Sequence, residues 1–362
     1  MRRALRLALR GAGRVAPNPL VGCVLVRDGA VVGEGWHREY GGPHAEVEAL
    51  RTAGEAARGA TAYVTLEPCN HWGKTPPCTE ALLAAGVRRV VVATPDPFPA
   101  AAGGADRLRA AGLAVDVGLL DGAARETNAA FLFAAFGADR PWVTLKLALS
   151  LDGAVADHTR GPGWLTGPES KRAVHRLRAT HDAVCVGIGT ALADDPELTV
   201  RDAPPPRVPP LRVVFDRTAR LPVEGRLVRT ARDVPVAVVC GPDAPGGRVA
   251  ALERAGVRIV IADGLAAALV LLRRDHGVRA LLAEGGARIS GALWAADLVD
   301  RLVIFRAPVV LGAGAIPAFE GAPAERAAGA RRLPVVRAGW HGRDRMTVYA
   351  VHDAPSGPSS PT

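Results

Sequence analysis

The chain is organised around residues 43–78, which contain three short runs rich in metal-ligating side chains: Pro43-His44-Ala45-Glu46, Glu67-Pro68-Cys69 and Pro76-Pro77-Cys78. One imidazole and two thiolates can occupy three corners of a zinc tetrahedron and leave the fourth corner for water. An open corner favours a catalytic zinc, because the bound ion lowers the pKa of its water enough to supply hydroxide near neutral pH. We therefore predict a zinc site with the ligands His44, Cys69 and Cys78.

Glu46 follows His44 by two residues and is not required as a fourth ligand. We predict that it moves protons between the water and a leaving amine, as the glutamate does in zinc nucleobase deaminases. Pro43 and Pro77 are expected to precede helices, which would place His44 and Cys78 at helix N-termini, where the helix dipole favours a thiolate. Taken singly, these residues also fit a helix start and inert core cysteines, and a structural zinc is the remaining alternative.

Composition limits the class of protein. A length of 362 residues suggests two domains, and 49% hydrophobic with 22% charged residues describes a soluble globular chain. The five cysteines are odd in number, which indicates a reducing compartment without a disulfide framework. Residues 1–10 are expected to form an amphipathic helix whose apolar run is too short for a signal peptide or a membrane span. We expect a cytoplasmic protein. The net charge of +9 could indicate nucleic acid, but aromatic residues make up only 4% and the arginines are scattered, so phosphorylated small molecules explain the charge equally well.

Strands and helices alternate through the first half, which predicts a largely parallel sheet covered on both faces. The strands are expected at 21–26, 31–36, 61–66, 89–93 and 115–120, and the helices at 1–10, 45–53, 78–85, 106–111 and 123–135. Gly137 and Pro141 mark a boundary between a deaminase domain, 1–139, and a second domain, 140–353, before a Pro/Ser-rich tail, 354–362.

The second half alternates in the same way. Its strands are expected at 142–149, 183–186, 212–215, 236–239, 258–261 and 280–283, and its helices at 169–179, 250–255, 266–273 and 287–294. Two glycine-containing turns follow strands, Gly187-Ile188-Gly189-Thr190 and Glu284-Gly285-Gly286. Such turns let backbone amides approach phosphates, although tight packing is an equally simple explanation. The third glycine of a Rossmann fingerprint is missing, so that fold is not predicted.

Three motifs of the first half resemble the deaminase of the bifunctional riboflavin-biosynthesis family: Pro17-Asn18-Pro19-Leu20-Val21-Gly22, His44-Ala45-Glu46-Val47 and the run from Glu67 to Cys78. The eight residues between Cys69 and Cys78 are the most specific signal, since cytidine and polynucleotide deaminases usually have two. The resemblance implies a cytidine-deaminase-like three-layer α/β/α domain. It also implies substrate contacts at Asn18, His37, His71 and Lys74, the last two toward a ribose phosphate.

The second half resembles the reductase of the same family, which implies a dihydrofolate-reductase-like α/β domain. The matching motifs are Leu145-Lys146-x-Ala148-x-Ser150-Leu151-Asp152-Gly153, Trp164-x-Thr166, Leu177-Arg178-Ala179, Gly189-Thr190, the run from Asp194 to Arg201, and Glu284-Gly285-Gly286. The implied NADPH contacts are Ala148, Trp164, Thr190, Asp194, Gly286, Ala287, Arg288, Ile289, Ser290, Gly291 and Ala292. The implied substrate contacts are Arg178, Leu198, Arg201 and Glu284, with both arginines directed at a ribose phosphate.

The resemblance implies zinc-dependent deamination of a diaminopyrimidinone phosphoribosyl compound, followed by NADPH-dependent reduction of its ribosyl group to ribityl. The expected partner is this small molecule, with no nucleic acid and no membrane, and a homo-oligomer is expected. Pro162 and Arg217 stand where the family usually has serines near substrate and cofactor, and Phe98 replaces an asparagine. Three alternatives remain: a deaminase with a weakened reductase-like domain, a polynucleotide deaminase and a non-enzymatic zinc module.

Overall fold

The computed structural model describes the chain apart from residues 74–75, 100, 160–162, 324–325, 327 and 356–362. The chain forms two compact units, Met1–Ala138 and Asp139–Asp353, and Ala354 and Pro355 belong with the first. Arg125 of the first unit donates to the carbonyl oxygen of Pro355 at 3.3 Å. Most of the expected tail, 356–362, lies outside the described residues. In the described part of the chain, no helix is long and apolar enough to cross a bilayer.

The first unit contains a five-stranded sheet of order β2-β1-β3-β4-β5. Its elements are α1 (Arg2–Ala8), η1 (Leu9–Gly11), β1 (Gly22–Arg27), β2 (Ala30–Trp36), α2 (Ala45–Ala53), η2 (Gly54–Ala57), β3 (Thr61–Leu66), α3 (Cys78–Ala84), β4 (Arg89–Thr94), α4 (Gly104–Ala110), β5 (Ala114–Val117), α5 (Asp121–Thr127) and α6 (Ala129–Ala135). β1 is antiparallel to β2 and β3, whereas β3, β4 and β5 are parallel to one another. The sheet is therefore mixed, because the hairpin at its start reverses the chain.

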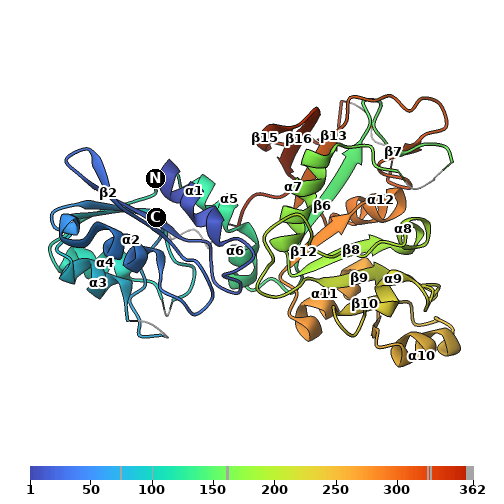
Figure 1. The fold of residues 1–362 in the computed structure, drawn as a ribbon, viewed down its shortest axis with the longest axis horizontal. Coiled ribbons are helices and arrows are strands. Elements are labelled where there is room, and N and C mark those ends of the chain that lie inside the picture. Colours follow the sequence, from blue (N-terminus) through green and yellow to red (C-terminus); the bar gives the residue numbers. More distant parts are fainter. Residues whose placement is uncertain (74–75, 100, 160–162, 324–325, 327, 356–362) are drawn as a thin grey trace. The chain divides into compact units, whose positions relative to one another are not determined.

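Alternation along β1 separates the two faces of this sheet. Cys23 and Leu25 join a core cluster with α2, α3 and α4, while Val24 joins a second cluster with α1. The expected three-layer arrangement is confirmed, and Figure 1 shows α2, α3 and α4 on one side of the sheet and α1 and α5 on the other.

Glycines allow the helices to lie directly on the sheet. A Cβ atom on Gly35 of β2 would lie 2.2 Å from the carbonyl oxygen of Ala45 and 2.3 Å from the amide nitrogen of Ala49, both in α2. A Cβ atom on Gly22 of β1 would lie 2.1 Å from the carbonyl oxygen of Ala4 in α1. These contacts are to backbone atoms, which cannot move aside alone, so the position of α2 depends on Gly35.

Two expectations for the first unit are wrong. The single helix over 123–135 is interrupted at Asn128, whose buried side chain accepts from the amide of Leu20 at 2.8 Å and donates to its carbonyl oxygen at 3.0 Å. This pairing holds Asn128 outside the helical conformation, at φ −112° and ψ 21°. The strand over 115–120 ends at Val117, because Gly118 and Leu120 have φ angles of 108° and 61°.

The second unit contains a nine-stranded sheet of order β11-β10-β9-β8-β12-β6-β13-β16-β15, and β14 pairs separately with β7. Its elements are β6 (Trp142–Leu149), β7 (Ala154–Ala156), α7 (Pro168–Ala179), β8 (Ala183–Gly187), α8 (Ile188–Asp194), β9 (Leu211–Phe215), α9 (Arg226–Arg229), β10 (Val236–Cys240), α10 (Gly246–Arg254), β11 (Arg258–Ile261), α11 (Leu265–His276), β12 (Ala280–Glu284), α12 (Ala287–Ala295), β13 (Arg301–Arg306), β14 (Ile316–Pro317), β15 (Val335–His341) and β16 (Asp344–Ala350). In this order, each strand from β11 through β10, β9, β8, β12 and β6 to β13 is parallel to the next. The last two strands, β16 and β15, are added antiparallel.

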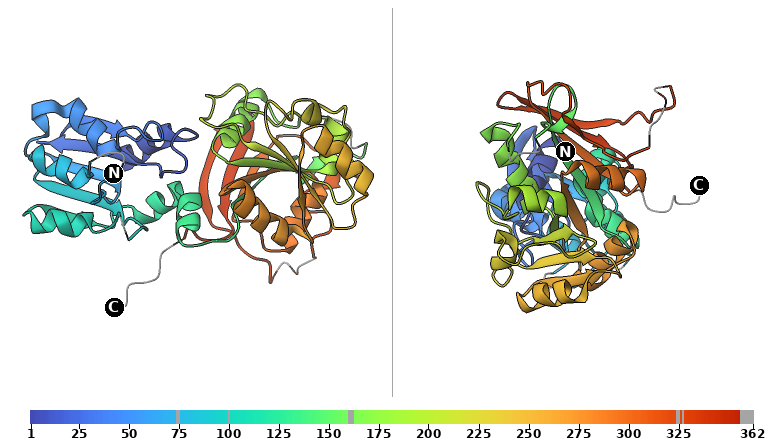
Figure 2. Two further views of the ribbon diagram at one scale, coloured as in Figure 1. Left: turned by 90° about the horizontal axis from the view of Figure 1, so that it is seen from below. Right: turned by 90° about the vertical axis from the view of Figure 1, so that its right-hand side faces the viewer.

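Neighbouring residues on each central strand enter different cores. Cys185 and Val213 pack with α11 and α12, whereas Val184 and Val214 pack with α8, α9 and α10. The parallel part of the sheet is therefore covered on both faces, as Figure 2 shows.

The glycine-containing run Gly187–Thr190 is not a separate turn. Gly187 caps α8, and Ile188 to Thr190 form the first turn of that helix. The expected elements of the second half all occur, with small shifts of their ends, but the sequence patterns did not predict β13, β15 and β16.

Replacing Gly35 by alanine should push α2 away from β2 and lower the free energy of unfolding of the first unit by about 2 to 3 kcal/mol. Gly122→Ala is the matched control, because a Cβ atom at this position in α5 meets no atom within 4 Å. We expect the control to be neutral or to add up to about 1 kcal/mol, since alanine favours a helix over glycine. Urea unfolding measures both, and equal stability of the two variants would contradict the packing argument.

Candidate active sites

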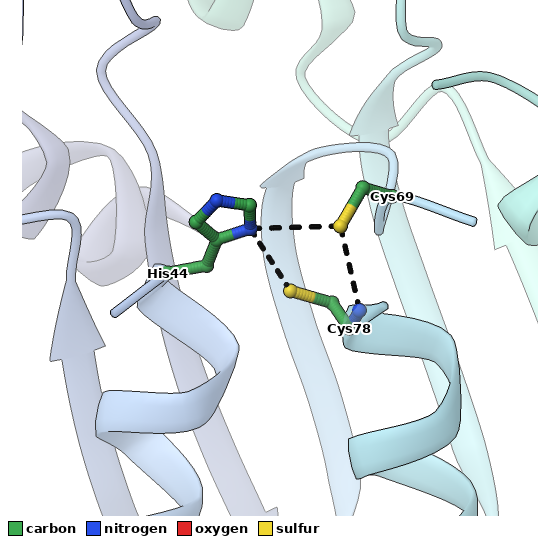
Figure 3. Close-up of side chains that lie close together, drawn as sticks. All are labelled: His44, Cys69 and Cys78. Atoms are coloured by element: carbon green, nitrogen blue, oxygen red, sulfur yellow. Dashed lines mark hydrogen bonds between the residues drawn. The ribbon is translucent and has the colours of Figure 1, made fainter. Parts of the chain in front are cut away.

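Three side chains with soft or borderline ligand atoms meet at one point of the first unit. His44 caps the start of α2, Cys78 is the first residue of α3, and Cys69 follows β3. The Nδ1 atom of His44 lies 3.2 Å from the Sγ atom of Cys78 and 3.5 Å from that of Cys69, and all three ligand atoms lie within 4.8 Å of one another. Figure 3 shows the imidazole facing both sulfurs. The expected helix starts at His44 and Cys78 are confirmed.

The proton distribution in this cluster suits cation binding. A hydrogen bond from the thiol of Cys78 lowers the pKa of Cys69 to about 4, against the opposing effect of burial, and the imidazole of His44 lowers it further. The backbone amide of Cys78 also donates to the Sγ atom of Cys69 at 3.4 Å. A metal ion binding here would replace the proton that the two sulfurs share.

Glu46 lies on the first turn of α2 and is 3% exposed. Burial raises the pKa of its carboxyl group to about 7, and the positive charge of His44 opposes this shift. The carboxylate also interacts with the thiol of Cys78. A carboxyl group with a pKa near the working pH can both accept and return a proton.

Asn18 and His37 lie together beside the ligand cluster. The Nδ2 group of Asn18 is 3.1 Å from the Nε2 atom of His37, and the Nδ1 atom of His37 is 3.0 Å from the carbonyl oxygen of Pro43. His37 therefore donates from Nδ1 and accepts at Nε2 as a neutral imidazole, in line with the lowering of its pKa by burial. Its ring meets that of His44 edge-on, with 5.6 Å between centroids.

The loop between the two cysteines is anchored at its base. Glu67, which sequence analysis did not assign to the site, accepts from the amide of Ala105 at 2.8 Å and from that of Asp96 at 3.2 Å. The sequence signal for this role was the glutamate that stands directly before Pro68-Cys69. His71 is exposed at the outer part of this loop, and Lys74 lies outside the described residues.

The second unit brings Thr190 and Gly286 together. β8 and β12 are adjacent and parallel, so the helices that follow them begin side by side. Gly286 has a φ angle of 91°, and a Cβ atom there would lie 2.8 Å from the Oγ1 atom of Thr190. Only glycine leaves this space open, which is the arrangement that a phosphate at a helix start requires.

The other expected cofactor contacts are distributed around these turns. Ala148 lies on β6, Asp194 ends α8, and Trp164 is 61% exposed with Lys171 5.0 Å from its ring centre. Among the α12 positions, Ala287, Ile289, Ser290 and Gly291 are buried, while Arg288 and Ala292 face outward. Gly291 is required for packing, since a Cβ atom there would lie 2.2 Å from the carbonyl oxygen of Glu320. Pro162 lies outside the described residues.

Arg178 and Glu284 form a buried ion pair. Nη2 of Arg178 donates to Oε2 of Glu284 at 2.9 Å, and Nε donates to Oε1. Burial acts to raise the pKa of Glu284, but the charge and hydrogen bond of Arg178, together with the charges of Lys146 and His175, hold the pKa below its usual value. Lys146, opposite Glu284 on the neighbouring strand, is a half-buried cation that sequence analysis named within a motif without giving it a role, and loss of solvent around it lowers its pKa.

Leu198 and Arg201 lie on the loop after α8. Leu198 is 3% exposed with a φ angle of 54°, and the amide of Arg201 donates to Nδ1 of His175 at 3.0 Å. The guanidinium of Arg201 pairs with Glu197 and that of Arg178 with Glu284. The two arginines thus face separate carboxylates here and do not converge on one point.

Comparisons with known proteins match both halves. A model of the RibD C-terminal domain matches residues 141–336, and a model of the cytidine and deoxycytidylate deaminase zinc-binding region matches residues 1–94. The riboflavin biosynthesis protein RibD of Aquifex aeolicus is 42% identical over 316 residues, 87% of either chain. The chain belongs to the RibD family. The Escherichia coli RibD is 41% identical over 332 residues, 87% of this chain and 88% of its own.

Solved RibD structures resemble this chain over nearly its whole length. Acinetobacter baumannii RibD has a TM-score of 0.80 and 38% identity, covering 96% of this chain and 97% of its own. A Thermotoga maritima diaminohydroxyphosphoribosylaminopyrimidine deaminase/5-amino-6-(5-phosphoribosylamino)uracil reductase has a TM-score of 0.81 and 32% identity, covering 97% of both. The predicted fold class is confirmed. The chain is a bifunctional riboflavin-biosynthesis enzyme with a zinc-binding deaminase domain and a reductase domain.

The ion pair of Arg178 and Glu284 should make the second unit sensitive to acid. Because the folded pKa of Glu284 lies below its ordinary value of 4.5, its contribution to stability is complete above pH 4.5 and is lost as the pH falls through the folded pKa. Glu284→Gln should lower the free energy of unfolding by about 3 to 5 kcal/mol at pH 7, since Arg178 then stays buried without its counterion. It should also flatten the acid dependence.

Urea unfolding between pH 3 and pH 7 checks this expectation. Glu224→Gln is the control, because Glu224 is exposed in the same unit. A Glu284→Gln variant as stable as the wild type at pH 7 would show that the pair contributes no net stability.

Proposed function

We propose that the first unit hydrolyses the amine of 2,5-diamino-6-(5-phosphoribosylamino)pyrimidin-4(3H)-one and releases ammonia. The observation that carries this proposal is the buried carboxyl group of Glu46 beside the cluster of His44, Cys69 and Cys78. The deaminase named among the solved relatives acts on a compound of this class. Polar groups for the pyrimidine are supplied by Asn18 and His37.

The donor set fits zinc, because two sulfurs and one imidazole nitrogen lie within 4.8 Å of one another and further protein ligands are not needed at a catalytic site. When bound, the zinc would activate a water molecule as a nucleophile near neutral pH. The buried carboxyl group of Glu46 would hold a proton and could move it between an attacking water and the leaving amine. His37 stays neutral, and its contact with Asn18 holds both side chains in place for the substrate.

Glu46→Gln should retain zinc and lose deamination by a factor of at least about 10³, since the amide cannot carry the proton. Ammonia release and zinc content, measured on the same samples, check this expectation. Glu55→Gln is the control, because Glu55 is exposed shortly after α2. Equal ammonia release by both variants would contradict a catalytic role for Glu46 and favour a non-enzymatic zinc module.

For the second unit we propose NADPH-dependent reduction of the deaminated product from ribosyl to ribityl. The space left by Gly286 beside Thr190 fits a cofactor phosphate, and NADPH would supply hydride to the anomeric carbon of the ribose. The pair of Arg178 and Glu284 orients the sugar hydroxyl groups. Lys146 is half-buried opposite Glu284 with a lowered pKa, which suits a donor of the proton that the opening sugar oxygen takes up.

Mass spectrometry of the diaminopyrimidinone ribosyl phosphate, incubated with zinc-loaded protein, tests both reactions. Without NADPH we expect an amine to be replaced by oxygen, and with NADPH we expect two further hydrogen atoms. Deamination without reduction would end the reductase proposal and leave a deaminase with a second domain that only binds. An unchanged substrate would end both.

A further inference from the structure

Arg212 is a fully buried arginine on β9 that none of the motifs above includes. Its relative exposure is 0%, and it is the largest fully buried side chain among the described residues. Its Nη1 atom donates to Oγ1 of Thr230 at 2.8 Å and to the carbonyl oxygen of Glu197 at 3.2 Å. Its Nη2 atom donates to the carbonyl oxygen of Thr230 at 2.9 Å and to that of Val234.

The charge of Arg212 is met by backbone oxygens. Among the residues that the structure describes, no carboxylate lies within ion-pair distance of its guanidinium, and its Nε atom has no hydrogen-bond partner. Burial lowers its pKa to about 10. An apolar side chain of similar volume is often as stable as a buried charge or more so. At this place, however, such a side chain would leave the carbonyl oxygens of Glu197, Thr230 and Val234 without this donor, so the guanidinium ties the loop at Glu197 to the segment 230–234.

The loop that Arg212 holds is in a strained conformation. Leu198 follows Glu197, is buried in the same core as β9, and has a φ angle of 54°, which a leucine rarely adopts. On the other side of Leu198, the carbonyl oxygen of Thr199 accepts from Nη1 of Arg178 at 2.9 Å. Two buried guanidinium groups thus bind the carbonyl groups that flank this leucine.

The second guanidinium links the loop to the reductase site. Arg178 binds Thr199 through Nη1 and Glu284 through Nε and Nη2, so one side chain contacts both the loop and the end of β12. The same loop carries Arg201, whose amide is bound by His175. A loop released at Glu197 would relax at Leu198 and withdraw one of the partners that keep Arg178 against Glu284.

We propose that Arg212 is a positioning residue of the reductase site, which fixes the 197–201 loop in its strained conformation so that Leu198, Arg178 and Glu284 are ready to bind the phosphoribosyl substrate. This inference rests on the proposed reductase function. Arg212 is fully buried and acts through the backbone of the loop, by its hydrogen bond to the carbonyl oxygen of Glu197.

Steady-state kinetics of Arg212→Met tests the proposal. We expect the KM for the deaminated substrate to rise about tenfold, because a hydrogen bond from a charged donor is lost at the loop, with a smaller change in kcat. Arg212→Lys, which keeps one charged donor, should recover part of this loss. Thr230→Val removes one acceptor of the guanidinium and leaves the residues of the loop unchanged, and it should also raise the KM. This variant replaces Arg212→Met in the test if Arg212→Met fails to fold.

Val238→Ala is the control, since Val238 is fully buried in the same core on β10 and its apolar side chain cannot form a hydrogen bond to the loop. It should lower the melting temperature and leave the KM unchanged. The deaminase reaction of each variant, carried by the other unit, is the internal reference for active protein. An unchanged KM in Arg212→Met, or an equal rise in Val238→Ala, would overturn the positioning role. A wild type that deaminates but reduces nothing would instead end the proposed reductase function, and this inference with it.

Discussion

The chemistry of both units depends on the point where a β-strand ends and a helix begins. At this point the first amides of the helix have no partner within it, and adjacent parallel strands lie about 4.8 Å apart, so groups from separate parts of the chain can meet. Cys69 follows β3 and Cys78 begins α3, while Thr190 and Gly286 begin the helices after β8 and β12. The remaining side chains of each site are arranged around these junctions.

The two sites use buried charge differently. In the first unit, Glu46 is buried without a cation bonded to it, so its pKa rises to about 7 and its proton is exchangeable. In the second unit, Arg178 and Glu284 are buried as a bonded pair, which keeps both charged and fixes their positions. The first arrangement suits proton transfer and the second suits orientation of a ligand.

Local patterns predicted most of the first unit correctly. The strand over 61–66 and the helix starts at His44 and Cys78 agree with the structure, because proline, alternation and helix-start signals act over a few residues. The helix over 123–135 was wrong, because Asn128 pairs with Leu20, more than a hundred residues earlier. The strands β13, β15 and β16 at one edge of the second sheet were not predicted, and β15 is largely exposed, so its buried pattern is weak.

The sequence by itself determined which residues gather at the cluster of His44, Cys69 and Cys78. These ligands and Glu46 stand in short motifs whose residue types and spacing indicate a zinc site. It also determined two alternating α/β domains. Only the tertiary structure decided what the buried arginines bind: Arg178 pairs with Glu284, and Arg212 binds the carbonyl oxygen of Glu197. A long guanidinium side chain could bond to many groups of the chain, and only the packing of the folded core decides which acceptors lie within its reach.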